Sequence, residues 1–190
     1  CRTPDGRFDD DKAARILALP QVRMVEIKLA QGAKPGNGGL LPKEKITKEI
    51  AEIRGIPMGV DCHSPNRFPE CADAGAVVDF ISRVRGLTGK PVGLKMVVGA
   101  SSEVEELCRE IVSRGVGPDF IAVDGKEGGT GAGPLALADY VGLPLIDALT
   151  IVDNALRRAG IRDEVTLIAS GKIATGGEVA CHIALGADLV

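Results

Sequence analysis

The residues best suited to chemistry near the start of the chain lie in segment 26–39, which reads EIKLAQGAKPGNGG. Glu26 and Lys28 alternate with apolar residues, which predicts a strand that buries both charges on one face. A loop with four glycines and Lys34 follows this strand. So many glycines indicate a backbone that bends sharply or closely approaches another group. The segment therefore predicts the rim of a site for an anionic ligand.

Lys95 is a second candidate, because it interrupts an apolar segment that is expected to form a strand at residues 91–98. A buried ammonium group requires a partner. In a structural interpretation, Glu26 on a nearby strand pairs with Lys95 inside the fold. In a functional interpretation, Lys95 supports an electron-rich atom of a ligand. We favour the second, because buried ionisable groups gather at functional sites.

A glycine-rich loop at residues 125–133 follows Asp124, which ends another predicted strand. The loop lacks the Gly-Lys-Ser/Thr ending of a P-loop, so nucleotide hydrolysis is not indicated. Its glycine content fits a wall that packs closely against a flat cofactor. A flexible lid is the alternative interpretation.

Ser170, Gly171 and Lys172 lie between a predicted strand and a helix that Thr175 is expected to cap. Backbone N–H groups at the N-terminus of a helix bind phosphate well. This loop is therefore a candidate phosphate site, and an ordinary tight turn is the alternative.

The elements that must position these residues alternate along the chain. Strands are expected at residues 22–29, 91–98, 119–123 and 165–169 and from residue 187 onward, and helices at residues 10–19, 48–54, 77–85, 102–115, 148–158 and 175–186. Residues 60–69 are expected to be irregular. Helix caps are predicted at Thr47 and at the pairs Ser102/Glu105 and Thr175/Glu178. Apolar strands that alternate with helices are typical of a parallel sheet covered by helices.

The candidate residues follow the C-terminal ends of successive strands, where (β/α)8 barrels carry their chemistry. No Gly-x-Gly-x-x-Gly fingerprint follows a first strand, so a Rossmann fold is not supported. Five strands are predicted, whereas a barrel needs eight strands and roughly 250 residues. The predicted fold class is therefore α/β, an incomplete (β/α)8 TIM barrel with about strands 4–8 present, formed by residues 1–190 as one domain. The chain starts at Cys1 and stops within a predicted strand, so we expect a piece of a longer protein.

Composition narrows the possible function classes. The net charge is −3, and the lack of a basic stripe argues against nucleic-acid binding. No apolar run approaches the length of a membrane span, and the N-terminus does not resemble a signal peptide. The five cysteines are scattered without a Cys-x-x-Cys pair, which is typical of a reduced, cytoplasmic protein. With two histidines and no ligand spacing, we expect no metal site and interpret Cys62-His63 as loop structure.

Four segments together resemble the FMN-binding barrel of the glutamate synthase family, and most closely its single-chain branch. They are KLAQGAKPG at 28–36 with Gly38-Gly39, GLK at 93–95, DG and GGTGA within 124–132, and SGK at 170–172. The resemblance covers nearly the whole chain. It implies an FMN-dependent oxidoreductase of glutamate biosynthesis. In that reaction ammonia adds to 2-oxoglutarate, and reduced FMN delivers hydride to the resulting 2-iminoglutarate to give L-glutamate.

The resemblance also implies roles for individual residues. Lys34 and Lys28 hold the carboxylates of the keto acid, with Glu26 on the same substrate side. Lys34 and Lys95 are the catalytic candidates, and Lys95 lies near the N1/O2 edge of the flavin, where a cation stabilises the reduced ring. The further cofactor-binding candidates, which pack near the ring or hold its phosphate, are Gln31, Asp124, Gly128, Gly129, Thr130, Gly131, Ser170, Gly171 and Lys172.

Further components follow from the same resemblance. It implies a source of ammonia or glutamine and an electron donor, either ferredoxin or an NAD(P)H module, as partners, and it is compatible with a homo-oligomer. An iron–sulfur cluster is expected only downstream of Val190. We expect the isolated fragment to be inactive and to bind FMN weakly or not at all.

One position departs from the family pattern. Glutamate synthases proper have a glutamine directly after the paired glycines, where it contacts 2-oxoglutarate, and this chain has Leu40. An apolar side chain cannot make that hydrogen bond. Another FMN-dependent barrel oxidoreductase, acting on a different 2-oxo or 2-hydroxy acid, therefore stays open as an alternative. A non-redox phosphate-binding barrel and a non-catalytic scaffold are the others.

Overall fold

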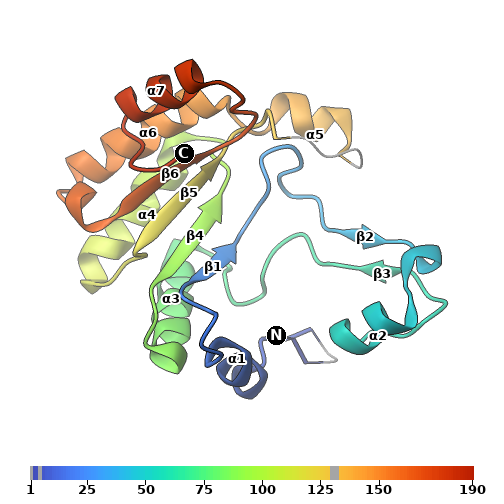
Figure 1. The fold of residues 1–190 in the computed structure, drawn as a ribbon. Helices are drawn as coiled ribbons and strands as arrows, with labels where there is room; N and C mark the ends of the chain where they lie inside the picture. Colours follow the sequence, from blue (N-terminus) through green and yellow to red (C-terminus); the bar gives the residue numbers. More distant parts are fainter. Residues whose placement is uncertain (1, 4–5, 129–132) are drawn as a thin grey trace.

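A parallel sheet forms the centre of the computed structural model, which describes residues 2–3, 6–128 and 133–190 (Figure 1). The sheet has four strands in the order β1 (Val25–Lys28), β4 (Val92–Met96), β5 (Phe120–Asp124) and β6 (Thr166–Ser170). Leu189 adds a single parallel bridge to Ile168. The parallel pairing confirms the predicted α/β sheet, although the last expected strand is reduced to that bridge.

Helices cover one face of this sheet (Figure 1). The covering layer consists of α3 (Ala74–Thr88), α4 (Ser101–Arg114) and α6 (Leu145–Arg158), and neighbouring helices in this layer pack against one another. The remaining helical elements outside the arm described below are α1 (Asp10–Leu17), α5 (Leu135–Tyr140), the 3-10 turn η2 (Arg162–Glu164) and α7 (Gly176–Ala184). Each connection between neighbouring parallel strands thus contains a helix, as barrel topology requires. None of the helices in the described ranges is long and apolar enough to span a membrane.

The core lies between the sheet and these helices. Ile27, Leu94, Ile121 and Leu167 are register partners across the four strands and form one row. All four are at most 5% exposed and belong to one cluster with helix residues such as Leu149. Because side chains alternate along a strand, the neighbouring residues of each strand point to the opposite face.

The opposite, inner face of the sheet carries the polar residues. Lys28 is the register partner of Lys95, and Lys95 is the partner of Ala122. Glu26 and Lys28 are exposed, so the prediction that β1 buries its charges is wrong. The reason is that the covering helices lie on the other face, where Ile27 of β1 is buried and Val25 is partly buried.

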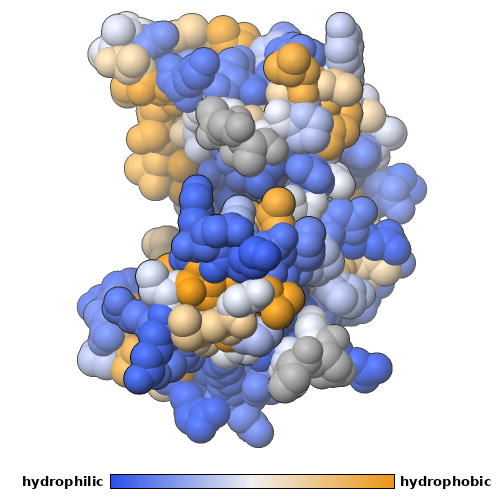
Figure 2. Space-filling view, turned by 90° about the vertical axis from the view of Figure 1, so that its right-hand side faces the viewer, coloured by the Kyte–Doolittle hydropathy of each residue, from blue (hydrophilic) through white to orange (hydrophobic). Residues whose placement is uncertain are grey.

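An arm formed by residues 36–68 lies on the side of the inner face (Figure 1). It contains β2 (Leu40–Leu41), the 3-10 turn η1 (Lys43–Lys45), α2 (Lys48–Arg54) and β3 (Cys62–His63), with β2 antiparallel to β3. The sequence predicts the bounds of α2 correctly but misses both strands, because two residues are too few for a periodic pattern. Hydrophilic side chains predominate on this side of the molecule (Figure 2).

Two of the three predicted helix caps are confirmed. Thr47 accepts a hydrogen bond from the Ile50 N–H at 3.3 Å. Thr175 and Glu178 form the reciprocal capping box at the start of α7. These caps are local side-chain contacts within a few residues, so the sequence alone can specify them.

The capping box predicted at Ser102 and Glu105 is wrong. Helix α4 already begins at Ser101, and Glu103 accepts a hydrogen bond from the Ala100 N–H at 3.4 Å. The other predicted helices and the four paired strands are present with ends shifted by at most three residues. The short helix α5 was not predicted.

Candidate active site

Asp124 is the centre of a cluster at the C-terminal ends of three strands. Its side chain is only 6% exposed, and Lys95 Nζ lies 3.2 Å from its Oδ1. Ser170 Oγ donates a hydrogen bond to the same oxygen at 3.0 Å, and the Gly32 N–H donates to Oδ2 at 2.7 Å. Lys95 Nζ also donates to Ser170 Oγ at 3.5 Å. The cluster therefore joins β4, β5 and β6 to the loop that follows β1.

Lys95 pairs with Asp124 and not with Glu26, so the structural interpretation of its partner is wrong. The register sets Glu26 beside Gly93, two residues before Lys95. Side chains on a strand lean along the strand direction, and Asp124 lies at the end of the adjacent strand toward which Lys95 reaches. The neighbour of Lys95 on the β1 side is instead Lys28, a second cation.

The glycines of these loops allow their backbones to come close together. A Cβ atom on Gly32 would lie 2.0 Å from the Gly125 carbonyl oxygen, and one on Gly125 would lie 2.6 Å from Leu145 Cβ. The Gly125 N–H donates to the Ser170 carbonyl at 2.9 Å. Part of the glycine content that predicts close approach to a cofactor thus serves the packing of one loop on another.

A cavity of about 1040 Å³ lies between β1, the loop after it, the N-terminal residues and the arm. Lys28, Gln31 and Lys34 line it, as do the glycines of the loop, and the Lys28 Nζ donates to Gln31 Oε1 at 3.4 Å. Asp9 is the one carboxylate among its described lining residues. The predicted substrate-side lysines are therefore brought together around one cationic space.

Sequence reasoning missed further cations of this cavity. They are Arg2, Lys12, Arg54 and Arg67, with His63 beside them. Arg54 ends α2 in the arm, and its position in the last turn of a helix gave no sign of a ligand role, since basic residues favour that position for the helix dipole alone. A search for cations shortly after the glycine-rich loop could have found it.

Arg2 is the cation of this group that has an acidic partner among the described residues. Its Nη1 lies 2.8 Å from Glu70 Oε2, and its guanidinium lies 4.4 Å from the centre of the Phe68 ring. Burial raises the pKa of the Glu70 carboxyl, but the hydrogen bonds from Arg2 and from the Phe8 N–H outweigh it and lower the pKa below its usual value. The ion pair with Glu70 therefore holds Arg2 in the wall of the cavity and neutralises its charge. The charges of Lys28, Lys34 and the remaining cations make the interior of the cavity positive.

The predicted phosphate loop is partly engaged by the protein itself. The Glu178 carboxylate accepts hydrogen bonds from the N–H groups of Ala174 and Thr175, both at 2.9 Å. The N–H groups of Gly176 and Gly177, in the same first turn of α7, have no partner among the described residues. These two groups remain able to bind an anion.

Several predicted residues lie apart from the cluster and from the cationic cavity. Glu26 is not among the described residues that line the cavity. Lys172 is exposed, with a positive φ of 42°. Gly128, in contrast, lies beside the cluster: its N–H donates to the Gly125 carbonyl at 3.2 Å, and a Cβ on it would lie 3.8 Å from both carboxylate oxygens of Asp124. Gly129, Thr130 and Gly131 lie outside the described residues.

Leu40 does not line the cavity, although the loop glycines directly before it do. It is the register partner of His63 in the β2–β3 ribbon, and the residue is 57% exposed. Leu40 therefore contributes neither a polar group nor a wall to the cavity, although its register partner His63 lines it.

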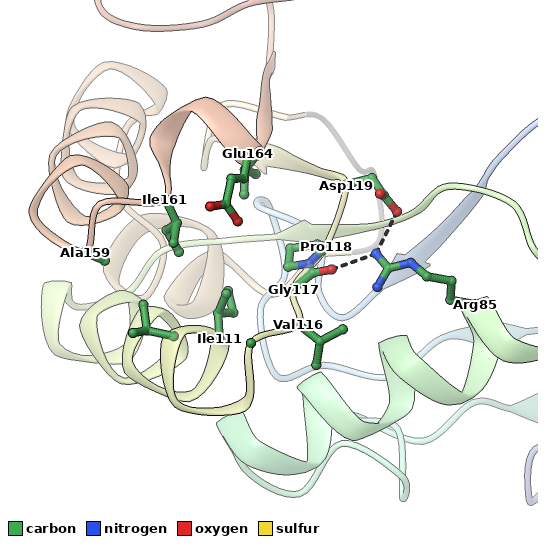
Figure 3. A pocket seen from close by; sticks show the side chains of 12 residues that line it. Arg85, Ile111, Val116, Gly117, Pro118, Asp119, Ala159, Ile161 and Glu164 are labelled. Atoms are coloured by element: carbon green, nitrogen blue, oxygen red, sulfur yellow. Dashed lines mark hydrogen bonds and ion pairs between the residues drawn. The ribbon is translucent and has the colours of Figure 1, made fainter.

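A second cavity of about 550 Å³ lies at the opposite end of the sheet (Figure 3). Its wall includes Asp119 and Val165, which precede β5 and β6, together with the residues that close α4 and α6. Arg85, its cation, is already bound to Asp119 at 2.7 Å and to the Gly117 carbonyl at 2.7 Å. Barrels place their chemistry at the C-terminal ends of their strands, so this cavity is not the candidate site.

Comparisons with known proteins agree with the fold. A double-mutant flavocytochrome b2 with pyruvate bound superposes with a TM-score of 0.54 at 16% sequence identity, over 94% of this chain and 37% of that chain. A mutant of the same protein with benzoylformate gives a TM-score of 0.53 at 15% identity, over 94% of this chain and 36% of that one. Together with the parallel sheet, these likenesses confirm the predicted partial (β/α)8 barrel.

Sequence comparisons identify the family. Residues 6–190 match the family described as the conserved region in glutamate synthase. The chain is 43% identical over 189 residues to the glutamate synthase large subunit-like protein YerD of Bacillus subtilis, covering 100% of this chain and 36% of the relative. It is 40% identical over 168 residues to an archaeal-type glutamate synthase (NADPH) of Dehalococcoides mccartyi, covering 88% of this chain and 33% of that relative. The chain spans about a third of the length of these relatives. It belongs to the glutamate synthase family.

Proposed function

We propose that this chain forms part of the flavin- and substrate-binding barrel of a glutamate synthase-type oxidoreductase. The reaction is the FMN-dependent reduction of 2-iminoglutarate, formed from 2-oxoglutarate and ammonia, to L-glutamate. The observation that carries the proposal is the cationic cavity with Lys28 and Lys34, which opens beside β1, next to the strand that carries Lys95. Family membership supports the reaction class.

The cationic cavity supports a dicarboxylate as the substrate. Lys28 and Lys34 share its wall with Arg54 and Arg67, and Asp9 is the one described acid there. Cations that line a common space repel one another unless an anion enters. Two carboxylates at opposite ends of a small molecule can each meet a separate cation, which an acid with one carboxylate cannot do.

The residues present fit FMN at two points. Lys95 has three N–H donors; among the described residues it forms an ion pair with Asp124 and a hydrogen bond to Ser170, which leaves donor capacity for a ring oxygen or nitrogen. The N–H groups of Gly176 and Gly177 suit the FMN phosphate. Bound FMN would supply the two electrons for reduction of the imine. Lys95 would hold positive charge against the edge of the ring where negative charge develops.

Leu40 bears on the choice of substrate. Because Leu40 has no polar group and is not among the described residues that line the cavity, recognition of the keto acid falls to Lys28, Lys34 and Arg54 in this proposal. The alternative substrate, a different 2-oxo or 2-hydroxy acid, differs from 2-oxoglutarate in the second carboxylate.

The experiment uses the native protein that carries residues 1–190. Purified protein should show a flavin absorption band near ~450 nm and should form glutamate from 2-oxoglutarate, ammonia and a reductant. Turnover of another 2-oxo or 2-hydroxy acid in preference to 2-oxoglutarate would support the alternative oxidoreductase. A protein that binds phosphate compounds but no flavin would support the non-redox barrel.

We also propose the remaining components of the reaction. NADPH appears in the names of several relatives, which favours an NAD(P)H module over ferredoxin as the electron donor. An iron–sulfur cluster, a source of ammonia and a cytoplasmic location are proposed on family membership alone. Supplying NADPH or reduced ferredoxin separately to the native protein distinguishes the two donors.

A further inference from the structure

The Asp124 carboxylate is unusual among the candidate residues because the protein already satisfies it. It accepts from the Gly32 N–H at 2.7 Å and from Ser170 Oγ at 3.0 Å, and it meets Lys95 Nζ at 3.2 Å. These partners come from the loop after β1, from β6 and from β4. A carboxylate that is 6% exposed and bound on both oxygens has little capacity left for a ligand.

Lys95 is held less completely than Asp124. Its side chain is 23% exposed; among the described residues it forms an ion pair with Asp124 Oδ1 and donates one hydrogen bond, to Ser170 Oγ, out of three N–H donors. Both acceptors lie on the β5–β6 side, because β5 and β6 follow β4 in the sheet. On the other side its register partner is Lys28, which offers no acceptor. Lys95 therefore keeps donor capacity that the described residues do not use, on the side of the inner face between β1 and β4.

We propose that Asp124 is a positioning residue that acts through Lys95 and does not itself contact the cofactor. It draws the ammonium toward β5 and Ser170, so that the remaining N–H points to one place on the inner face. Through Oδ2 it also fixes the Gly32 turn, whose loop carries Lys34 of the cationic cavity. One carboxylate thus sets the distance between the cofactor side and the substrate side of the site. The inference rests on the proposed function for its redox consequence, but the Gly32 contact stands without it.

The sign of the change in the flavin midpoint potential distinguishes this positioning role from a direct electrostatic effect of Asp124 on the flavin. The test measures the midpoint potential of flavin bound to the native protein and to its Asp124→Asn variant. If Asp124 positions Lys95, the Asn amide in the variant no longer holds the ammonium in place, and the potential should fall, as we also expect for Lys95→Met. If the carboxylate acts on the flavin directly, loss of a negative charge raises the potential instead, and the proposal is overturned. We expect a fall equivalent to about a tenfold loss in relative affinity for the reduced flavin, which is about 30 mV for a two-electron couple.

A double-mutant cycle tests whether the effect passes through Lys95. Adding Asp124→Asn to Lys95→Met should lower the potential no further, because the group that Asp124 positions is gone. An equal fall in both backgrounds would contradict the proposal. If Asp124→Asn does not fold, Ser170→Ala removes one acceptor of Lys95 while keeping the ion pair, and it should lower the potential by a smaller amount. An unchanged midpoint potential in Ser170→Ala would then contradict the positioning role of Asp124.

A matched control lies at the other end of the same strand. Asp119 also binds a cation and a backbone N–H, with Arg85 at 2.7 Å and the Val92 N–H at 2.7 Å. Asp119→Asn should lower the thermal midpoint without moving the flavin potential. If Asp119→Asn moves the potential as much as Asp124→Asn does, the effect is one of general stability and the proposal fails.

Amide hydrogen exchange gives a readout that needs no flavin. The Gly32 N–H should exchange at least about tenfold faster in Asp124→Asn than in Asp119→Asn, because its acceptor is weakened. Unchanged exchange at Gly32 would refute the anchoring of the turn. A native protein that binds no flavin would overturn the proposed function, and the exchange result would still decide whether Asp124 anchors the turn.

Discussion

At the scale of single residues, the register of the sheet places charged side chains of this site next to one another. Lys28 and Lys95 are side by side on the inner face, and like charges directly across neighbouring strands are destabilising. Asp124 compensates Lys95, and Gln31 gives Lys28 a neutral acceptor at 3.4 Å. The excess positive charge is what makes this face suited to an anionic ligand.

Replacing Lys34 tests the substrate side. In the native protein, Lys34→Met should raise the KM for 2-oxoglutarate by about tenfold or more, the effect of losing one charge-assisted contact. Lys45→Met is the control, since Lys45 lies exposed in η1 and does not line the cavity. Steady-state kinetics measure both. Equal KM values in the two variants would remove Lys34 from the substrate site.

Gly32 tests the close packing of the loops. Gly32→Ala places a methyl group 2.0 Å from the Gly125 carbonyl oxygen, and we expect a loss of about 1–3 kcal/mol in the free energy of unfolding, as for other overpacked sites. The control is Gly86→Ala in α3, where no atom lies within 4 Å of the added Cβ and alanine should stabilise the helix by about 0.5–1 kcal/mol. Urea unfolding of both variants measures the difference, and a Gly32→Ala protein as stable as the parent would contradict the packing argument.

Among the elements, α6, η2 and the segment before Leu189 are joined by one arginine at the end of the sheet away from the site. Arg162 Nε lies 2.7 Å from Asp153 Oδ1, and its Nη2 donates to the Gly186 carbonyl at 2.7 Å and lies 3.0 Å from Asp188. Asp188 in turn accepts from the Leu167 N–H in β6 at 2.7 Å. This network holds elements in place at the end where barrels typically carry stability and not catalysis.

The network predicts a dependence of stability on pH. Burial raises the pKa of Asp153, but hydrogen bonds from Arg157 and Arg162 outweigh it, so the pKa lies below its ordinary value of 3.8. A lowered pKa in the folded state gives stability that is fully present well above pH 3.8 and is lost as the pH falls through the folded value. Asp153→Asn should therefore cost roughly 1–3 kcal/mol at pH 7, and the difference from the parent should shrink below pH ~4.

Urea unfolding at pH 7 and at pH ~3.5 measures this difference. The exposed Asp163 in the adjacent turn η2 gives the control Asp163→Asn, which should stay within about 0.5 kcal/mol of the parent at pH 7. A constant difference between Asp153→Asn and the parent at both pH values would show that its charge does not contribute.

For the molecule as a whole, the inner face, which carries the proposed site, is only partly enclosed. The covering helices lie on the other face, and Glu26 and Lys28 are exposed. A flat cofactor is held tightly when most of its surface is enclosed. The chain spans about a third of the length of its relatives, so the relatives have further residues with which to enclose it.

The expected consequence concerns residues 1–190 in isolation. Titrated with FMN, they should show at least about a hundredfold weaker affinity than the native protein, which corresponds to about 2.7 kcal/mol. Quenching of flavin fluorescence measures both affinities, with circular dichroism as the control that the isolated chain is folded. Equal affinities would mean that this chain alone completes the flavin site.

The sequence by itself determined those features that depend on near neighbours. The periods of apolar residues specified the alternating helices and strands, and Thr47 and Thr175 marked two helix starts. The end of each strand marked the edge of the sheet where Asp124 and Ser170 meet. These features are predictable because the interactions that produce them span only a few residues.

Only the tertiary structure decided which side chains meet. It paired Lys95 with Asp124 and left Glu26 exposed, because strand register and not charge type selects neighbours. It also brought Arg54 of the arm to the cavity of Lys34. Such contacts join residues distant in the sequence, so no local pattern encodes them, and they depend on the packing of the whole sheet, its helices and the arm.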